Sequence, residues 1–266
     1  ITGSNSFNLG GPIYSIQESK NLIEELLEDK DVNLKNIFLE INITDFNKPH
    51  TLKAVYHSNF KNTLFLAKYE LERKGLKKFL NEWSKNKSTS KIISFLEYNF
   101  LPGQASNVVN FLRGDYKIRT TNIQKGKGYA PLVGKGGETK KPTYTKKGEE
   151  IVIKRLQIAK NTIKNRDRHP KDFSKTYLEY LQNIQDELEA QNIKVYFVLN
   201  QIFDGNMLRT FDKLNEKNRI FAGDPDKFPE IYDPLKQWDS GHINHITADE
   251  VTRKFAKEYL NLIQKN

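Results

Sequence analysis

A carboxylate and an imidazole stand three residues apart in a short segment near the C-terminus, residues 238–244 (WDSGHIN). A turn of this length that contains glycine can bring the Asp239 carboxylate to Nδ1 of His242. Such a contact fixes the imidazole tautomer, leaves Nε2 as a base, and stabilises the cation that forms when the base takes a proton. The segment therefore predicts a proton-transfer pair. The same residues also allow a plainer structure, in which Asp239 caps the turn and His242 packs against Trp238.

His245 lies close enough in sequence to His242 and Asp239 to suggest a metal site. No fourth ligand is evident, and we favour the alternative of a solvated histidine at the start of a helix. The chain contains no cysteine, which excludes thiolate nucleophiles and cysteine-based zinc or iron–sulfur sites. The glycine- and lysine-rich segments 126–128 and 134–137 lack the spacing of a phosphate-binding P-loop. We therefore expect neither a metal nor an organic cofactor.

The elements that would position the pair alternate between helices and short apolar strands. A strand that follows a helix after almost no loop is typical of α/β folds with a mostly parallel sheet. The segment that holds Asp239 comes after the last predicted strand, where sites lie in open α/β sheets. Thr247 and Glu250 are expected to cap the final helix. Helices are predicted from Ser15 onward and over 50–86, 149–165, 173–191 and 248–263, and strands over 36–41, 192–199 and 219–222.

Length fits one large domain or two small ones, and composition indicates a folded chain that carries a basic insertion. The 266 residues are 37% hydrophobic, which is enough apolar mass for a sizeable core and argues against extensive disorder. We expect a single domain over residues 1–266 with an insertion at about 101–148, because residues 113–147 carry ten Lys and Arg against Asp115 and Glu138. Glycines interrupt regular structure there, so the insertion is either a solvated, mobile loop or a loop over a binding cleft.

The net charge of +10, from 43 Lys and Arg against 33 Asp and Glu, suits an anionic partner without identifying it. An anionic glycan, an anionic membrane surface and nucleic acid all fit the charge. Tyr116, Tyr129 and Tyr144 in the insertion offer stacking surfaces for single-stranded nucleic acid. We do not expect nucleic acid as the partner, because no recognised nucleic-acid module accompanies these tyrosines. No apolar run approaches the ~20 residues of a membrane-spanning helix.

Taken together, residues 238–244 and the amphipathic helix that follows resemble the last sequence block of the SGNH (GDSL-like) hydrolases. The family pattern there is Asp-x-x-His-Leu-Asn ahead of a terminal helix. Residues 228–233 (FPEIYD) are similar to the lead-in of envelope-associated members, and residues 8–12 (NLGGP) with the strand over 37–41 look like the second and third blocks. The resemblance covers both ends of the chain, whereas residues 50–190 match nothing in the family.

The resemblance implies a three-layer α/β/α fold of the flavodoxin-like type and a Ser-His-Asp mechanism on esters. In that mechanism the backbone amides of Gly10, Gly11 and Ile13 and the side chain of Asn42 would hold the oxyanion. Ile13 stands where the family pattern has a glycine, and the family's Gly-x-Asn-Asp is absent around Asn42.

The nucleophilic serine of the family ends the first strand, and His would activate it. Ser4 is one candidate, but only Ile1 and Thr2 precede Gly3-Ser4, which is too short for the strand that must carry it. We expect the nucleophile upstream of Ile1, with Ser4 as the second choice and an ordinary turn role for Ser4 as the alternative.

The resemblance implies an ester hydrolase or O-acyltransferase that acts on an acylated cell-envelope polymer such as a polysaccharide. The alternative is a non-catalytic relative that uses the same cleft to bind a glycan or a partner protein. Either function would place the protein outside the cytoplasm, in the periplasm or at the cell surface. We expect a membrane anchor in a segment upstream of Ile1.

Overall fold

The computed structural model describes residues 16–28, 33–41, 72, 75, 136–202 and 204–264. The chain divides into two compact units, and α1 (Ile16–Glu28) belongs to one of them. All other helices and strands named below belong to the second unit. Within α1, Ile16 and Ile23 are buried, in keeping with the predicted amphipathic helix. Of the helix predicted over 50–86 only residues 72 and 75 are described, and residue 72 is helical. Most of the basic insertion lies outside the described residues.

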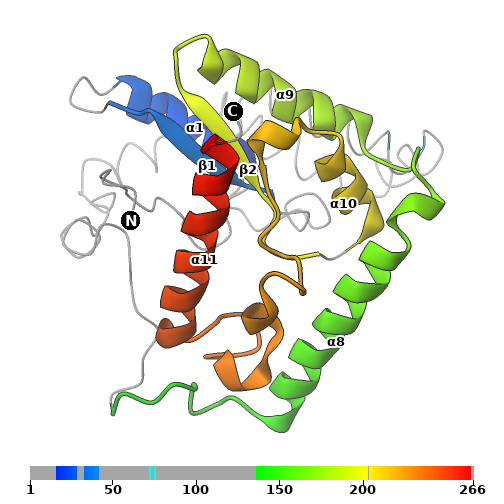
Figure 1. The fold of residues 1–266 in the computed structure, drawn as a ribbon, viewed down its shortest axis with the longest axis vertical. Coiled ribbons are helices and arrows are strands. Elements are labelled where there is room, and N and C mark those ends of the chain that lie inside the picture. Colours follow the sequence, from blue (N-terminus) through cyan, green and yellow to red (C-terminus); the bar gives the residue numbers. More distant parts are fainter. Residues whose placement is uncertain are drawn as a thin grey trace, which may run out of the picture. The chain divides into compact units, whose positions relative to one another are not determined.

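Three parallel strands form the described sheet in the order β1-β2-β3 (Figure 1). These are β1 (Asn36–Glu40), β2 (Lys194–Val198) and β3 (Arg219–Ile220). Parallel strands require crossover connections, and helices supply them here, so the α/β character predicted from the sequence is confirmed. The third strand is shorter than the predicted run over 219–222.

A tight connection joins α9 (Lys175–Glu189) to β2, as predicted from the lack of a loop in the sequence. Asn192 adopts a left-handed backbone with φ of 60°, a conformation that Asn tolerates better than most residues. The amide of Ile193 then donates to the carbonyl of Leu188 at 3.0 Å, which ends the helix and starts the strand. At the other end of α9, Ser174 accepts from the Tyr177 amide at 3.2 Å as the N-cap.

Both faces of β2 are buried. Tyr196 and Val198 point to one face and pack against α11 (His245–Gln264), while Val195 and Phe197, which alternate with them, are fully buried on the other. Helix α9 also contacts β2. The residues of α11 that pack on the sheet share a helical spacing: Val251, Phe255, Tyr259 and Leu262.

The second unit also contains α8 (Lys146–Lys164), which begins three residues earlier than predicted, and α10 (Gly205–Asp212), which the sequence analysis missed. Asp204 caps α10 by accepting from the Met207 amide at 2.9 Å. Four single turns of 3₁₀-helix complete the unit: η1 (Arg166–Arg168), η2 (Glu216–Asn218), η3 (Pro229–Tyr232) and η4 (Pro234–Lys236). η3 contacts both α8 and α11, so the segment before the candidate site is held between two helices.

Gly223 ties this segment to the ends of the strands. Its amide donates to the carbonyl of Leu199 at 2.6 Å, and its carbonyl accepts from the hydroxyl of Tyr232 at 2.6 Å. A Cβ at this position would lie only 2.9 Å from the carbonyl carbon of Asn200, so a larger residue would force the backbone apart. Within the part of the chain that the structure describes, no helix is both long and apolar enough to cross a bilayer.

Candidate active site

The predicted proton-transfer pair lies on a tight hairpin that leads directly into α11. The amide of Asn244 donates to the carbonyl of Lys236 at 3.0 Å, and the amide of Trp238 donates to the carbonyl of His242 at 2.8 Å. Gln237 and Ile243 form an antiparallel bridge between these two hydrogen bonds. The backbone therefore closes on itself and fixes the turn at 239–241.

This turn brings the Asp239 carboxylate to the His242 ring, with Oδ1 lying 2.8 Å from Nδ1. The same oxygen accepts from the amides of Gly241 at 2.7 Å and His242 at 2.9 Å. Asp239 therefore caps the turn and contacts the imidazole at once. The His242 side chain is 65% exposed, so its ring is accessible to solvent.

The electrostatics of the pair keep Asp239 ionised. Burial raises the pKa of its carboxyl, but the hydrogen bonds from the Gly241 amide and from His242 outweigh that cost and hold the pKa below its ordinary value. A carboxylate beside Nδ1 favours the tautomer that carries its proton on Nδ1. Nε2 then presents a lone pair, and it has no hydrogen-bond partner among the described residues.

Gln237 shapes the segment that enters the hairpin, a role that the sequence did not indicate. Its side chain is 1% exposed, and Nε2 donates to the carbonyl of Ile231 at 2.9 Å. The carbonyls of Asp233 at 3.3 Å and Glu230 at 3.4 Å lie around the same amide group. The Gln237 amide thereby supplies a hydrogen-bond donor to backbone carbonyls of η3 and of the residue that follows it.

The cap of α11 differs from the prediction. Asn244 accepts from the Thr247 amide at 2.9 Å through its side chain, and its carbonyl accepts from Ala248, so Asn244 is the N-cap and Thr247 lies within the helix. The expected capping role of Thr247 was wrong because the helix begins at His245. The last residue of the segment 238–244 thus orients the helix that follows the pair.

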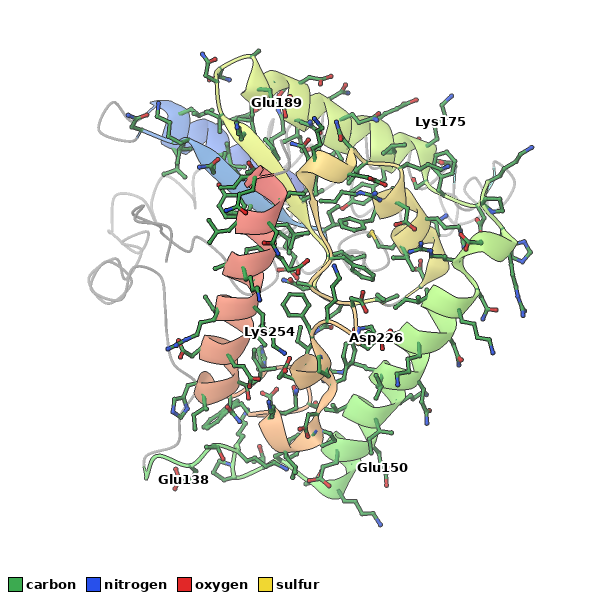
Figure 2. The ribbon with its side chains drawn as sticks, viewed as in Figure 1. Glu138, Glu150, Lys175, Glu189, Asp226 and Lys254 are labelled. Carbon is green, nitrogen blue, oxygen red and sulfur yellow. The ribbon has the colours of Figure 1, made fainter. Side chains whose placement is uncertain are left out.

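An ion pair joins α11 to η3 next to the hairpin. Lys254, labelled in Figure 2, contacts the carboxylate of Glu230, whose side chain is 7% exposed. Burial raises the pKa of Glu230, but the hydrogen bond from Lys254 outweighs it, and the net pKa is lowered. The other carboxylate oxygen, Oε2, is shielded and has no hydrogen-bond partner among the described residues.

The described end of the basic segment lies against the hairpin. The amide of Lys141 donates to the carbonyl of Trp238 at 2.7 Å. Lys140 sits 4.5 Å from the centre of the Tyr144 ring and pairs with Glu149 at 2.9 Å. The hydrogen bond from Lys141 thus joins the stretch that Glu138 and Glu150 mark in Figure 2 to the hairpin.

The other predicted site residues lie outside the described residues. These are Ser4, Gly10, Gly11, Ile13 and Asn42. The chain is described as far as Ile41, whose amide donates to the carbonyl of Val198 at 2.8 Å and so continues alongside β2. Ile41, the residue before Asn42, thus lies at the carboxyl end of the sheet, which is the edge where sites occur in α/β folds.

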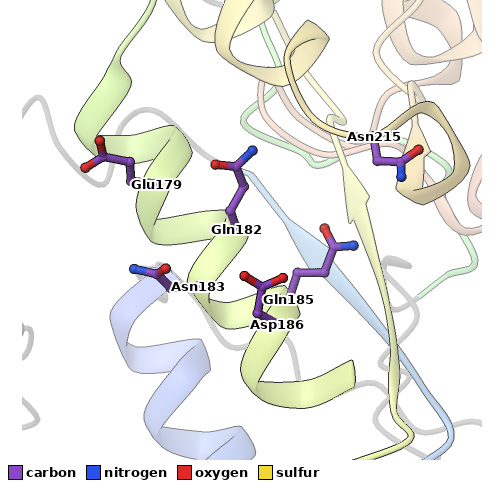
Figure 3. Close-up of a pocket in the computed structure, with 6 residues that line it drawn as sticks. All are labelled: Glu179, Gln182, Asn183, Gln185, Asp186 and Asn215. Carbon is purple, nitrogen blue, oxygen red and sulfur yellow. The ribbon is translucent and has the colours of Figure 1, made fainter. Parts of the chain in front are cut away.

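No group of three His, Asp or Glu side chains within the described residues is arranged to hold a metal ion. His245 begins α11, and its Nδ1 is shielded without a hydrogen-bond partner among those residues. A surface hollow of about 330 Å³ lies on α9 and is lined by carboxylates and amides, together with Asn215 (Figure 3). It contains neither Asp239 nor His242, and we assign it no chemistry.

Comparisons with protein-family models, with curated proteins and with solved structures find no match to this chain.

Proposed function

We propose that the protein is an ester hydrolase or O-acyltransferase of the SGNH type. The observation that carries the proposal is the contact of 2.8 Å between Oδ1 of Asp239 and Nδ1 of an exposed His242. The pair sits on a hairpin that precedes the last described helix of a unit with a parallel sheet. The sequence resemblance in residues 238–244 points the same way, because the family carries its acid–base pair in this block.

In the proposed mechanism a serine Oγ attacks the acyl carbonyl carbon while its proton passes to Nε2 of His242. Asp239 holds Nδ1–H and stabilises the imidazolium. When the tetrahedral intermediate collapses, the ester C–O bond breaks and Nε2 returns the proton to the leaving alkoxide. Water or an acceptor hydroxyl then attacks the acyl-enzyme and loses its proton to Nε2. The bond between the acyl carbon and serine Oγ breaks, and Nε2 returns the proton to Oγ, so the same residues serve hydrolysis and transfer.

The nucleophile and the oxyanion donors remain proposals from the resemblance. The serine would lie upstream of Ile1 or at Ser4. The amides of Gly10, Gly11 and Ile13 and the side chain of Asn42 would bind the oxyanion.

We also propose the three-layer arrangement of that family, which the burial of both faces of β2 supports. An acylated envelope polymer is the proposed substrate, and the periplasm or cell surface is the proposed location. A net charge of +10 would favour an anionic polymer or an anionic membrane surface nearby, through an attraction that salt weakens.

The test is hydrolysis of a chromogenic acetyl ester by the intact protein, together with labelling by a fluorophosphonate. His242→Ala should lower kcat by a factor of at least about 10³ and abolish labelling, because the base is lost. His245→Ala is the matched control on the same segment and should retain activity. Peptide mapping of the label identifies the serine.

A folded wild-type protein with neither turnover nor label would refute the enzymatic proposal. It would favour the alternative, in which the same surface binds a glycan or a partner protein without chemistry. Equal activity in wild type and His242→Ala would refute the role of His242 specifically.

A further inference from the structure

Arg155 on α8 is a largely buried arginine, and two neighbouring N–H donors of its guanidinium have no acceptor. Its Nε and Nη2 are both shielded from solvent and have no hydrogen-bond partner among the described residues. These two N–H groups point in the same direction and match the two oxygens of a carboxylate or phosphate. An unpaired buried guanidinium is costly, so a position that keeps one calls for an explanation.

Two other arginines of this unit satisfy the same two nitrogens with acceptors from a single acidic residue. Nε of Arg209 donates to the backbone carbonyl of Asp172 at 2.6 Å, and its Nη2 donates to the Asp172 carboxylate at 2.7 Å. Nε and Nη2 of Arg253 both donate to Oδ2 of Asp249, at 3.1 and 2.9 Å. No described residue supplies such an acceptor to Nε and Nη2 of Arg155.

The packing of α8 places this pair of donors on a helix that borders the hairpin. α8 contacts η3 and η4, the two turns that lead into the hairpin, and the segment before α8 is joined to it by the hydrogen bond from the Lys141 amide to the Trp238 carbonyl. Burial lowers the pKa of the Arg155 guanidinium, and the phenol groups of Tyr232 and Tyr144 and the carboxylate of Asp239 act against that shift. Asp239 makes no hydrogen bond to Arg155. Its Oδ1 is already occupied by the amides of Gly241 and His242 and by the His242 ring.

Tyr144 adds a third donor. Its hydroxyl is shielded and has no hydrogen-bond partner among the described residues, and burial raises its pKa, so it remains protonated at neutral pH. The ring rests on the backbone of Gly148, where a Cβ would come within 3.0 Å of it. Tyr144 lies near the end of the mostly exposed segment 136–145, which the Lys141 amide joins to the hairpin.

We propose that Arg155 and Tyr144 bind an oxyanionic group of the substrate, a carboxylate or a phosphate, beside the ester that His242 acts on. This inference rests on the proposed function for its catalytic part and adds the charge of the substrate. Because the donors are shielded, binding includes a local rearrangement that uncovers them. Arg155 is then the residue that selects anionic esters over neutral ones.

The first experiment compares two chromogenic esters of equal chain length, one neutral and one ending in a carboxylate, at constant ionic strength. Arg155→Gln should lower the ratio of kcat/KM for the anionic ester to that for the neutral ester by about 10- to 100-fold, the usual loss for a hydrogen bond to a charged group. Tyr144→Phe should lower it less. Arg168→Gln, at an exposed arginine beyond the far end of α8, is the control and should leave it unchanged.

The second experiment needs no turnover. Inorganic phosphate is titrated into the intact protein while the Nε–Hε resonance of Arg155 and the amide resonance of Gly241 are followed. Saturable shifts in wild type that disappear in Arg155→Gln support the inference even if no ester is hydrolysed. If Arg155→Gln does not fold, Arg155→Lys keeps the charge without the paired donors and should show the same loss.

Either of two results would overturn the inference. One is an equal reduction of kcat/KM for both esters in Arg155→Gln and Arg155→Lys. The other is a phosphate titration that is identical in wild type and in these variants. Each would mean that Arg155 serves only the packing of α8, with trapped water on its donors.

Discussion

Gln237 should be one of the most costly polar side chains of this unit to replace. The variant Gln237→Met keeps a side chain of similar length in the buried position and removes both amide protons. It loses the hydrogen bond of 2.9 Å to Ile231, and it leaves the carbonyls of Asp233 and Glu230 without their longer contacts.

The magnitude follows from these contacts. A single hydrogen bond contributes about 1 kcal/mol, and buried carbonyls left without a donor add about 1–3 kcal/mol more. We therefore expect the free energy of unfolding to fall by about 2–4 kcal/mol. Because Gln237 precedes the hairpin directly, the contact between Asp239 and His242 should loosen as well.

The assay is urea unfolding followed by circular dichroism and by the fluorescence of the tryptophans, one of which is the adjacent Trp238. Gln182→Met, at an exposed glutamine on α9, is the matched control and should stay within about 0.5 kcal/mol of wild type. A Gln237→Met protein as stable as this control, with an unchanged urea dependence, would refute the reasoning. It would mean that water replaces the amide at no cost.

Three further predictions concern stability. Gly223→Ala should lower the free energy of unfolding in urea by about 1–3 kcal/mol, because the new Cβ meets the Asn200 backbone at 2.9 Å. Gly241→Ala is the control and should lower it clearly less, because its Cβ would meet only Asp239 Oδ1 at 3.5 Å. Equal losses in the two variants would contradict this. Asn244→Ala should lower the free energy of unfolding by about 1 kcal/mol, because α11 loses its N-cap, and Asn244→Ser should restore most of this loss in the same assay. A Ser variant no more stable than the Ala variant would count against the cap. The pKa of Asp239 is lower in the folded state than in the unfolded state. Its contribution to stability is therefore present above the unfolded pKa near 3.8 and is lost as the pH falls through the folded pKa. A difference in the free energy of unfolding between wild type and Asp239→Asn that does not shrink with acidification would oppose this.

The spacing of apolar residues predicted the helices and strands of the second unit well where that spacing is regular. The helices near 149–165 and 173–191 and the strand over 192–199 lie close to α8, α9 and β2, because each buries a regular stripe of apolar residues. α10 escaped prediction because eight residues give only two turns, and its stability comes from packing its buried face. The start of α11 was misplaced because Asn244 competes with Thr247 as a cap, and sequence alone does not decide between them.

The chemistry near His242 was predicted only in part. The spacing of Asp239 and His242 is local, so a turn rule is enough to bring the pair together. Gln237 and Arg155 could not be found in this way. The carbonyls that accept from Gln237 come together only when η3 and the residues after it have folded, and the burial of Arg155 depends on the packing of α8. Neither residue belongs to a sequence pattern that indicates burial. A buried polar side chain can be identified only from the three-dimensional structure, which shows whether acceptors surround it.

The hairpin that carries Asp239 and His242 is closed by hydrogen bonds within its own backbone, so the contact between the two side chains is set locally. In the proposed mechanism, a mutation far from the hairpin would abolish activity by displacing the nucleophile while the imidazole stays correctly oriented. Inactive variants of that kind should still bind small imidazole-directed probes at His242, which separates loss of assembly from loss of the base.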